Sequence, residues 1–413
     1  MKSGYLKQNY LALGKRINTA THIIVTFRIE SPVPLRDSAQ IVAAESSVGT
    51  WTTTKTMKAA MFRRLSAKVI SVSPNDKLVR IAYPLELFEP GNIPQLLSSV
   101  AGNVFSMKLI TKLRLEDLKM PAAFLHSFLG PAHGIVGIRR LLGVPRRPLI
   151  GAIMKPKMGL SWREHAKFAA DCFLGGADLV KDDENLTDQR FNPFQKRVRE
   201  TLRLAKEIEK KTGERKMCVF NITAPASEMI RRARFIKQSG GNCAMIDIMT
   251  AGFAGVQAVR QAKTGLIIHA HRAMHSVMTR DPKHGISMLV IAKLARLAGV
   301  DQLHSGTVVG KMEGSARETV AINTFLKSPW GNIKPVMPIA SGGLHPRLVP
   351  KLLKIIGPDV IINFGGGIHG HPGGTLAGAR AAKQAVEAVT SHQRLSDYAK
   401  THPELQTALH YWR

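Results

Sequence analysis

Apolar and polar positions follow two different patterns along this chain. In the first third, runs rich in β-branched residues predict three strands, over 21–30, 67–73 and 77–87. An alanine-rich stretch and a second apolar stretch predict helices over 38–47 and 93–102. Together these segments predict a small antiparallel sheet with two helices on one face, which is an α+β unit.

From Pro148 onward, short apolar runs that end in polar or glycine residues alternate with longer amphipathic stretches. There are eight such runs, at 148–155, 177–184, 217–221, 243–248, 266–271, 302–305, 336–343 and 360–367. Between them lie helical patterns that include 196–211, 226–238, 287–297 and 374–389. Eight strand–helix units in roughly 250 residues are typical of a (β/α)₈ barrel, and a doubly wound parallel sheet is the structural alternative.

The predicted fold class is therefore α/β, with a (β/α)₈ TIM barrel preceded by a smaller, ferredoxin-like α+β N-terminal domain. We expect the N-terminal domain to occupy residues 1–125. The catalytic barrel, with C-terminal helices, is expected over residues 126–413.

Composition places the chain among soluble globular proteins without disulfides. Apolar residues make up 44% of the 413 residues, enough to build a core, which excludes a wholly disordered chain. The three cysteines show no CxxC spacing, so neither a disulfide framework nor a zinc knuckle is indicated. The N-terminus lacks an apolar signal core, and prolines and histidines interrupt the uncharged run 120–138. We expect a cytoplasmic protein without a membrane partner.

The chain is unusually basic, with 59 Lys and Arg residues against 29 Asp and Glu residues and a net charge of +30. The excess is spread evenly, because residues 1–130 hold 17 basic and 8 acidic residues and the remainder holds 42 and 21. Such a surface attracts anions in general, including phosphorylated metabolites and RNA, so nonspecific RNA contact is one expected consequence.

In a (β/α)₈ barrel, chemistry takes place at the C-terminal ends of the strands. A lone lysine or histidine there is most often a solvated or a core residue, but polar and glycine residues at all eight ends favour an active site. The residues at these ends are Lys155, Lys157, Lys181, Asp183, Glu184, Asn221, Asp247, His271, Arg272, His304, Ser341, Gly342, Gly343, Gly365, Gly366 and Gly367.

The segment from Lys181 to Glu184, KDDE, is the most specific of these strand ends. Its carboxylates are hard oxygen ligands of the kind that Mg²⁺ prefers. A neighbouring lysine would ordinarily form a salt bridge with them, and this interpretation stays open. The alternative is a desolvated lysine whose uncharged amine captures CO₂ and becomes a carbamate, which is a third oxygen ligand.

Two glycine runs follow the seventh and eighth predicted strands, at 341–343 and 364–367. Barrels commonly bind phosphate there through backbone N–H groups that glycine leaves accessible, although tight turns also explain such runs. Arg272 and Lys311 could hold a second phosphate, or the first one together with the glycines, and two anion sites suit a bisphosphate. Segment 306–314 places Lys311 between glycines, as in a mobile lid or an ordinary βα loop.

At this level of detail the chain resembles the large subunit of ribulose-1,5-bisphosphate carboxylase/oxygenase (RuBisCO), most of all its archaeal-type form III. The resemblance runs from about residue 20 to the C-terminus. The strings that carry it are AAESSVGTWTT (43–53), GNVFSMK (102–108), LRLEDLKMP (113–121), MKPKMGL (154–160), GGADLVKDDENLT (175–187), HAHRAMH (269–275), HGISM (284–288), DQLHSGTVVGKMEG (301–314), SGGLHP (341–346) and GGGIHGHPGG (365–374).

The resemblance implies a metal site and the main catalytic groups. Lys181, carrying an activating CO₂ as a carbamate, would hold Mg²⁺ together with Asp183 and Glu184, so that the metal polarises the sugar substrate. Lys155 would act as the acid/base, supported by Lys157.

The remaining site residues are implied in the same way. His271 would assist proton transfer and contact the sugar hydroxyls, and Ser341 would bond a substrate hydroxyl. Arg272 and His304 would bind one phosphate. The other phosphate would be bound by Thr50, Trp51, Gly342, Gly343, Gly365, Gly366 and Lys311, and Lys311 would also orient CO₂.

Glu45 and Asn103 match family positions that reach into a neighbouring subunit's barrel. The resemblance therefore implies a homodimer, or a higher assembly of dimers, with shared active sites and no small subunit. The segment after Trp51 is short and no long C-terminal tail is present, so we expect lid closure to differ from that of plant-type chains.

The implied activity is carboxylation of ribulose 1,5-bisphosphate to two 3-phosphoglycerates, with O₂ competing. Form III membership implies a role in salvage of ribose phosphates from nucleotides. One alternative is a RuBisCO-like enolase, isomerase or decarboxylase acting on a different sugar phosphate. Another is a basic RNA-binding or scaffold protein, although no nucleic-acid motif is present.

Overall fold

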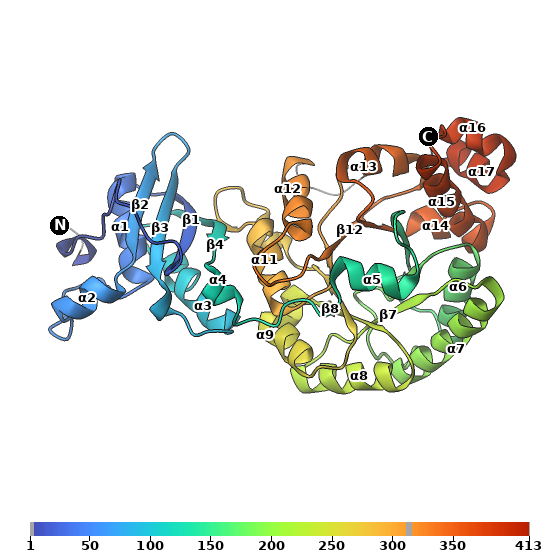
Figure 1. Cartoon of the computed structure of the whole chain (residues 1–413), viewed down its shortest axis with the longest axis horizontal. Helices are drawn as coiled ribbons and strands as arrows, with labels where there is room; N and C mark the ends of the chain where they lie inside the picture. Colours follow the sequence, from blue (N-terminus) through green and yellow to red (C-terminus); the bar gives the residue numbers. More distant parts are fainter. Residues whose placement is uncertain (1–3, 311–315, 413) are drawn as a thin grey trace. The chain divides into compact units, whose positions relative to one another are not determined.

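The computed structural model describes residues 4–310 and 316–412, which form two compact units (Figure 1). The first unit comprises Met1–Leu129, Met274–Leu297 and Gly331–Ile333. The second comprises Gly130–Ala273, Ala298–Trp330 and Lys334–Arg413. The division of the chain into domains at residue 125 stays a prediction.

The first unit is built on a five-stranded sheet with the order β10-β4-β1-β3-β2. Strand β1 pairs antiparallel with β3 and β4, and β10 adds a short parallel edge beside β4. The order β4-β1-β3-β2 is that of a ferredoxin-like βαββαβ unit, as predicted. The strands are β1 (His22–Glu30), β2 (Lys68–Ser73), β3 (Leu78–Pro84), β4 (Lys112–Lys119) and β10 (Gly285–Ile286).

Helix α1 covers this sheet because its alanines present a flat apolar face. Ala39, Ala43 and Ala44 are fully buried, and α1 packs on β1, β2 and β3. The helical segments of the unit are η1 (Gly4–Lys7), α1 (Leu35–Glu45), α2 (Ala59–Leu65), η2 (Leu85–Leu87), α3 (Ile93–Val100), η3 (Asn103–Ser106), α4 (Ala122–Leu125), α10 (Ser276–Thr279) and most of α11 (Met288–Ala298).

The second unit contains a closed barrel of eight parallel strands, in the order β11-β12-β13-β5-β6-β7-β8-β9. Each of the eight apolar runs forms one strand, so the barrel is confirmed and the doubly wound sheet is excluded. The strands are β5 (Leu149–Ile153), β6 (Leu179–Lys181), β7 (Met217–Asn221), β8 (Cys243–Asp247), β9 (Ile267–His271), β11 (Gln302–His304), β12 (Met337–Ser341) and β13 (Ile361–Phe364).

Helices of this unit surround the barrel, as Figure 1 shows for α6, α7, α8 and α9. Among the described residues they are α5 (Gly134–Leu142), α6 (Trp162–Leu174), α7 (Phe194–Thr212), α8 (Ala226–Gln238), α9 (Ile248–Gln261), α12 (Ala316–Lys327), η4 (Pro346–Leu348), α13 (Val349–Ile356), α14 (Gly366–His369), α15 (Gly374–Thr390), α16 (Leu395–Tyr398), η5 (Ala399–Thr401) and α17 (Pro403–Tyr411). None of the described helices has the length and apolarity needed to cross a membrane.

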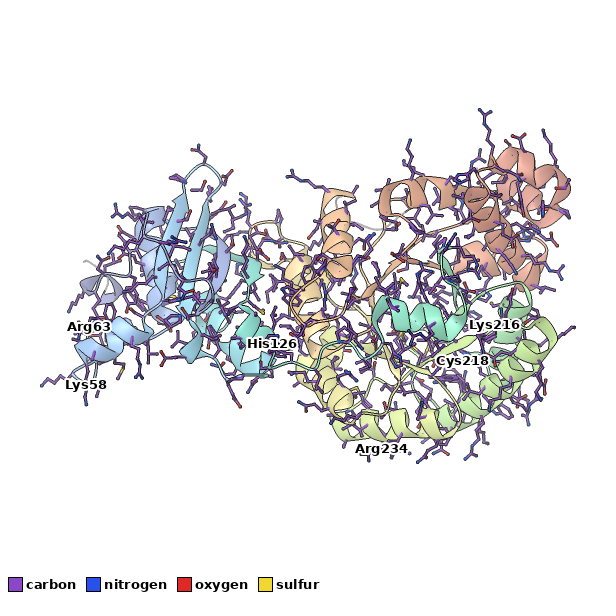
Figure 2. The ribbon with its side chains drawn as sticks, viewed as in Figure 1. Lys58, Arg63, His126, Lys216, Cys218 and Arg234 are labelled. Carbon is purple, nitrogen blue, oxygen red and sulfur yellow. The ribbon has the colours of Figure 1, made fainter. Side chains whose placement is uncertain are left out.

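The N-terminal end of the barrel is closed by an apolar cluster. Ile138 and Leu142 of α5 pack against the first residues of the strands, including Leu149, Leu179 and Met217. Because this end is filled by buried side chains, the polar strand ends lie at the opposite end of the barrel. Exposed cations lie elsewhere on the surface, such as Lys58 and Arg63 of the first unit and Arg234 of the second (Figure 2).

Asp301 fastens α5 to the barrel. Its fully buried carboxylate accepts hydrogen bonds from the backbone nitrogens of His133 at 2.6 Å and Gly134 at 2.9 Å. It also accepts one from the backbone nitrogen of Ile268, in β9, at 3.0 Å. One side chain therefore satisfies three buried donors at the start of α5 and in the barrel wall.

Replacing Asp301 with alanine should destabilise the barrel, because these donors would lose their acceptor. We expect the free energy of unfolding to fall by about 2–4 kcal/mol, as a shift of the urea midpoint followed by circular dichroism. Asp397→Ala, which removes an exposed partner of Lys400, is the control and should leave the midpoint unchanged. An unchanged midpoint in Asp301→Ala would show that the three N–H groups find other acceptors.

Candidate active site

The side chain of Lys181 ends in a buried amine. Lys181 is the last residue of β6, and its side chain is fully buried. Its Nζ has no hydrogen-bond partner within the described residues. Its ion-pair contact is with Glu184 Oε2 at 3.8 Å, too long for a hydrogen bond. Burial lowers the pKa of Lys181, because the charged form is desolvated. The ordinary salt bridge left open from the sequence is therefore not made at hydrogen-bonding distance.

Asp183 pairs with a different lysine. Lys155 Nζ, at the end of β5, donates to Asp183 Oδ2 at 2.7 Å, and Asn185 donates to Oδ1 from its side chain at 2.9 Å. Burial by itself raises the pKa of Asp183, but the hydrogen bonds from Lys155 and Asn185 outweigh it and lower the pKa. Asp183 is therefore an ionised carboxylate, and it places the Lys155 ammonium beside the strand end that carries Lys181.

The carboxylate of Asp182 is bonded to buried groups of the protein. Its carboxylate accepts from Arg197 at 3.1 Å and from the backbone nitrogen of Asn221 at 2.9 Å, and it contacts His165 Nε2 at 3.1 Å. Burial would raise the pKa of Asp182, but the charge of Arg197 and the hydrogen bond from His165 lower it overall. Asp182 thus supports the strand end structurally and leaves Asp183 and Glu184 as the acids for a ligand.

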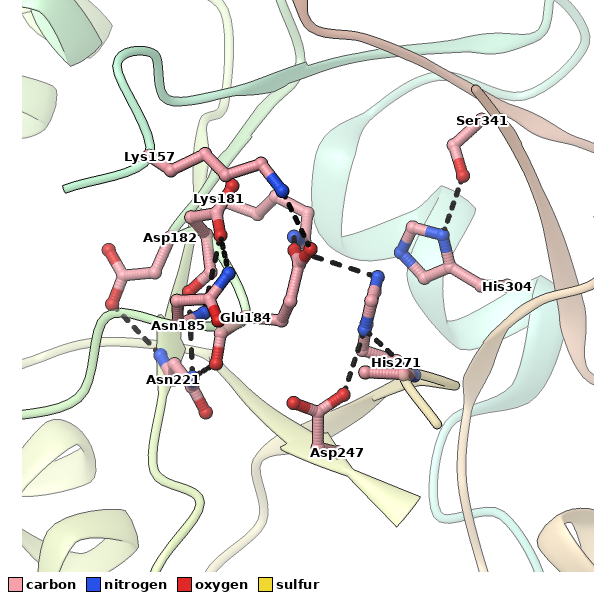
Figure 3. Close-up of polar contacts among 12 residues, drawn as sticks. Lys157, Lys181, Asp182, Glu184, Asn185, Asn221, Asp247, His271, His304 and Ser341 are labelled. Carbon is pink, nitrogen blue, oxygen red and sulfur yellow. Dashed lines mark hydrogen bonds and ion pairs between the residues drawn. The ribbon is translucent and has the colours of Figure 1, made fainter. Parts of the chain in front are cut away.

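Glu184 joins the lysines to a histidine from another strand (Figure 3). Its carboxylate lies 3.9 Å from Lys157 Nζ and 3.7 Å from His271 Nε2. His271 Nδ1 lies 2.8 Å from Asp247 Oδ1. Because a carboxylate only accepts, Asp247 favours the tautomer with a proton on Nδ1, in which Nε2 is the ring nitrogen that faces Glu184.

A chain of buried imidazoles orients Ser341. His269 Nδ1 donates to Gln302 Oε1 at 2.7 Å, so its Nε2 accepts from His304 Nε2 at 3.0 Å. His304 Nδ1 must then accept from Ser341 Oγ at 2.9 Å. Burial lowers the pKa of His269 and of His304, which keeps both rings neutral. The Ser341 oxygen keeps lone pairs for a ligand hydroxyl, while phosphate binding by His304 stays a prediction.

The two glycine runs pack on each other at this end of the barrel. Gly342 and Gly343 have φ values of +114° and +71°, a backbone conformation that favours glycine. A β-carbon at Gly367 would lie 2.1 Å from the carbonyl oxygen of Leu344, so only glycine fits there. One at Gly365 would lie 3.4 Å from Cε of Lys155, which places the second run beside the acid/base candidate.

The structure describes one of the two cations that were predicted to bind phosphate at the loops. Arg272 follows β9, and burial lowers its pKa to about 10, which leaves the guanidinium charged at neutral pH. One of its nitrogens lies 2.9 Å from where a β-carbon of Gly306 would be, so it reaches the loop after β11. Lys311 lies outside the described residues.

Four predicted site residues belong to the first unit. Glu45, at the end of α1, accepts a hydrogen bond from the Tyr5 hydroxyl at 2.7 Å. Trp51 is 72% exposed, Asn103 is exposed, and Thr50 is partly exposed. Large aromatic side chains are seldom left in solvent, so Trp51 is available for contact with a ligand or a partner.

The donor set at β6 fits a hard cation only with the help of Lys181. Among the described residues, no three His, Cys, Asp or Glu side chains are grouped to hold a metal ion. Asp183 and Glu184 are two oxygen donors, and a carbamate on Lys181 would be the third. The carbamate would give a role to the Lys181 amine, which otherwise makes no hydrogen bond with the described residues.

Sequence reasoning noted Asp247 and Asn221 at strand ends but gave them no role. Asp247 fixes the proton of His271, and Asn221 Nδ2 donates to the Glu184 backbone oxygen at 2.9 Å. Asn185 was passed over, although it stands two residues after Asp183 and donates to it. These supporting residues can be told apart from the other polar residues at the strand ends only by their distances in the structure.

The chain is similar to known proteins over nearly its whole length. Residues 134–412 match the family described as "Ribulose bisphosphate carboxylase large chain, catalytic domain", and residues 9–124 match its N-terminal domain. The chain belongs to the ribulose bisphosphate carboxylase large chain family. It is therefore a member of a carboxy-lyase family, as the sequence resemblance indicated.

Among its relatives is the ribulose bisphosphate carboxylase of Methanosarcina barkeri, with 49% identity over 95% of this chain and 96% of that protein. The carboxylase of Methanocaldococcus jannaschii is 48% identical over 92% and 94%.

Solved structures agree with the sequence relatives. The octameric enzyme from Pyrococcus horikoshii superposes with a TM-score of 0.95 at 45% identity, covering 98% of this chain and 96% of that one. The dimeric archaeal enzyme from Hyperthermus butylicus gives a TM-score of 0.93 at 42% identity, covering 99% of both chains. The archaeal-type resemblance is confirmed.

The unpartnered amine of Lys181 should react selectively with cyanate, a small linear molecule that modifies uncharged amines. Lys216, near the start of β7, is the matched control, because it is equally buried but donates to Ala177 and Glu214 (Figure 2). We expect Lys181 to be carbamoylated roughly tenfold faster, as measured by peptide mass spectrometry. The rate should fall as the pH drops through the lowered pKa of Lys181, because the amine gains a proton. Equal, slow modification of both lysines would contradict the arrangement described.

Proposed function

We propose that this protein is a ribulose-1,5-bisphosphate carboxylase that converts its substrate, CO₂ and water to two 3-phosphoglycerates, with O₂ as a competing substrate. The observation that carries the proposal is the buried Lys181 amine, which forms no hydrogen bond in the part of the chain that the structure describes and lies beside Glu184, near Asp183. Named relatives that are 42–49% identical over nearly the whole chain support the same reaction.

Activation would begin at Lys181. Its uncharged amine nitrogen attacks the carbon of CO₂, and one proton leaves as the carbamate forms. The carbamate would hold Mg²⁺ with Asp183 and Glu184. When bound, the metal supplies a Lewis acid that polarises a carbonyl and an adjacent hydroxyl of the sugar. Asp182 cannot take a place in this set, because Arg197 and His165 occupy its oxygens.

Proton transfer would be handled by groups with fixed orientations. His271 presents its Nε2 lone pair because Asp247 holds the proton on Nδ1. Lys155 carries the proton that a product carbanion needs, and Asp183 holds its ammonium at 2.7 Å. With Asp183 as a metal ligand, Lys155 would lose this acceptor and would be available to the substrate. Lys157, at 3.9 Å from Glu184, would keep the local field positive.

Substrate phosphates would bind on opposite sides of this centre. The glycine runs after β12 and β13 would hold one phosphate through backbone N–H groups, with Thr50, Trp51 and Lys311. Arg272 would hold the other beside His304, whose two ring nitrogens are engaged by His269 and Ser341, and Ser341 would accept a hydrogen bond from a sugar hydroxyl.

We propose a homodimer as the minimal active unit, without a small subunit, because Glu45 and Asn103 match family positions that reach into a second subunit's barrel. The related structures include a dimer and an octamer. We assign the enzyme to salvage of ribose phosphates from nucleotides on its archaeal-type resemblance alone.

Purified protein supplied with ribulose 1,5-bisphosphate, bicarbonate and Mg²⁺ should release phosphoglycerate, and Lys181→Ala should lower kcat by roughly 10³-fold or more. Chelation of the metal should have a similar effect. Lys206→Ala, on the exposed side of α7, is the control and should retain parental turnover. Absence of phosphoglycerate from well-folded parent protein would instead favour a RuBisCO-like enzyme of a different sugar phosphate.

Shared active sites can be tested by mixing two inactive variants. Glu45→Gln and Lys181→Ala should each be inactive, since each spoils both sites of its own dimer. Co-expressed in equal amounts, half of the dimers would be mixed, and one of their two sites would be intact. We expect activity to return to about a quarter of the parental value. No recovery in dimers shown by mass spectrometry to be mixed would place Glu45 in its own subunit's site, or outside any site.

A further inference from the structure

Trp412, which follows α17, lies against two histidines from different barrel loops. Its ring stacks on His345, with 5.7 Å between ring centroids and 20° between the planes. The ring of His371 lies 6.1 Å away at 54°. His345 follows β12 and His371 follows α14, so one indole connects the two loops that begin with the glycine runs.

These histidines stand close to the proposed phosphate site in the chain and in space. His345 is two residues after Gly343, and a β-carbon at Gly367 would lie 2.8 Å from Cα of His345. The second glycine run therefore lies against Leu344 and His345, so we expect a shift of His345 to displace the backbone beside it.

Stacking is the contact that orients His345. Its Nδ1 is buried and has no hydrogen-bond partner within the described residues. Burial, with the charge of Arg347, lowers the pKa of His345 and keeps the ring neutral at pH 7. A neutral imidazole lying nearly parallel to an indole is an aromatic stack of ordinary geometry.

Helix α17 is anchored by contacts that do not involve the indole ring. Arg347 Nη1 donates to the backbone oxygens of Leu409 at 3.0 Å and Trp412 at 3.3 Å. His371 Nε2 lies 3.0 Å from the Glu404 oxygen, and Leu405 is fully buried. Substitution of the indole should therefore leave α17 in place and remove only the stack.

We infer that Trp412 is a positioning residue, which holds the glycine runs after β12 and β13 in register through His345 and His371 and so sets the affinity for a substrate phosphate. This inference rests on the proposed function. Trp412 touches neither substrate nor reacting atoms, so its effect would fall on binding rather than on chemistry.

Full-length dimeric Trp412→Ala should show a KM for ribulose 1,5-bisphosphate raised about 5–10-fold, with kcat within about twofold of the parent. Trp412→Phe keeps an aromatic ring and should restore the KM to within about twofold. His345→Ala should raise KM as much as Trp412→Ala, and the double variant should add little to either. Gln406→Ala, exposed on the same helix, should behave as the parent.

Binding of inorganic phosphate, measured by calorimetry at 0.15 M NaCl, separates this inference from the proposed reaction. Weaker phosphate binding in Trp412→Ala, in a protein whose parent shows no turnover, would support the positioning role and reject the carboxylase. An unchanged KM and phosphate affinity in Trp412→Ala, or a loss confined to kcat, would overturn the positioning role. A parent that shows no turnover and binds no phosphate would overturn both.

Discussion

The structure depends at its centre on a buried lysine amine that forms no hydrogen bond with residues 4–310 or 316–412. Burying an unpaired ammonium costs several kcal/mol, so the group at Lys181 Nζ is driven toward its uncharged form. The charges of the neighbouring acids favour the ammonium but do not outweigh its desolvation. Asp183 is hydrogen-bonded to Lys155, and Asp182 contacts Arg197 and His165. Glu184 Oε2 lies 3.8 Å from the Lys181 amine. An uncharged amine beside two carboxylates is a poor structural element and a good nucleophile.

The barrel holds this arrangement in place. Its N-terminal end is closed by apolar residues of the strands and α5, and its opposite end gathers polar residues from separate strands. Three of the candidate site residues are each oriented by a second side chain: Lys155 by Asp183, His271 by Asp247, and Ser341 by His304. These supports reduce the number of orientations that each reactive group can adopt before substrate arrives.

Much of this could be predicted from the sequence, because buried parallel strands read as short apolar runs whose last residues are functional. All eight barrel strands and three strands of the first sheet were predicted correctly. Strand β4 was missed, since its alternation breaks where β1 and β4 shift register near Glu116. The short β10 was also missed, because a two-residue edge leaves no periodic signal.

The site was predicted less completely than the fold. Sequence spacing placed Lys181, Asp183 and Glu184 together, since they are neighbours after one strand. The spacing could not show that Asp182 bonds Arg197 or that Asp183 bonds Lys155. These pairs are 15 and 28 positions apart in the sequence. The stack of Trp412 on His345 likewise depends on where α17 docks, which no local pattern encodes.

The most direct measurement is a crystal structure of the protein equilibrated with bicarbonate and Mg²⁺ at high resolution. The account predicts a carboxyl group bonded to Nζ of Lys181 and a cation held between it, Asp183 and Glu184. An unmodified Lys181 side chain with no ion beside those carboxylates, in crystals of protein shown to be folded, would contradict it.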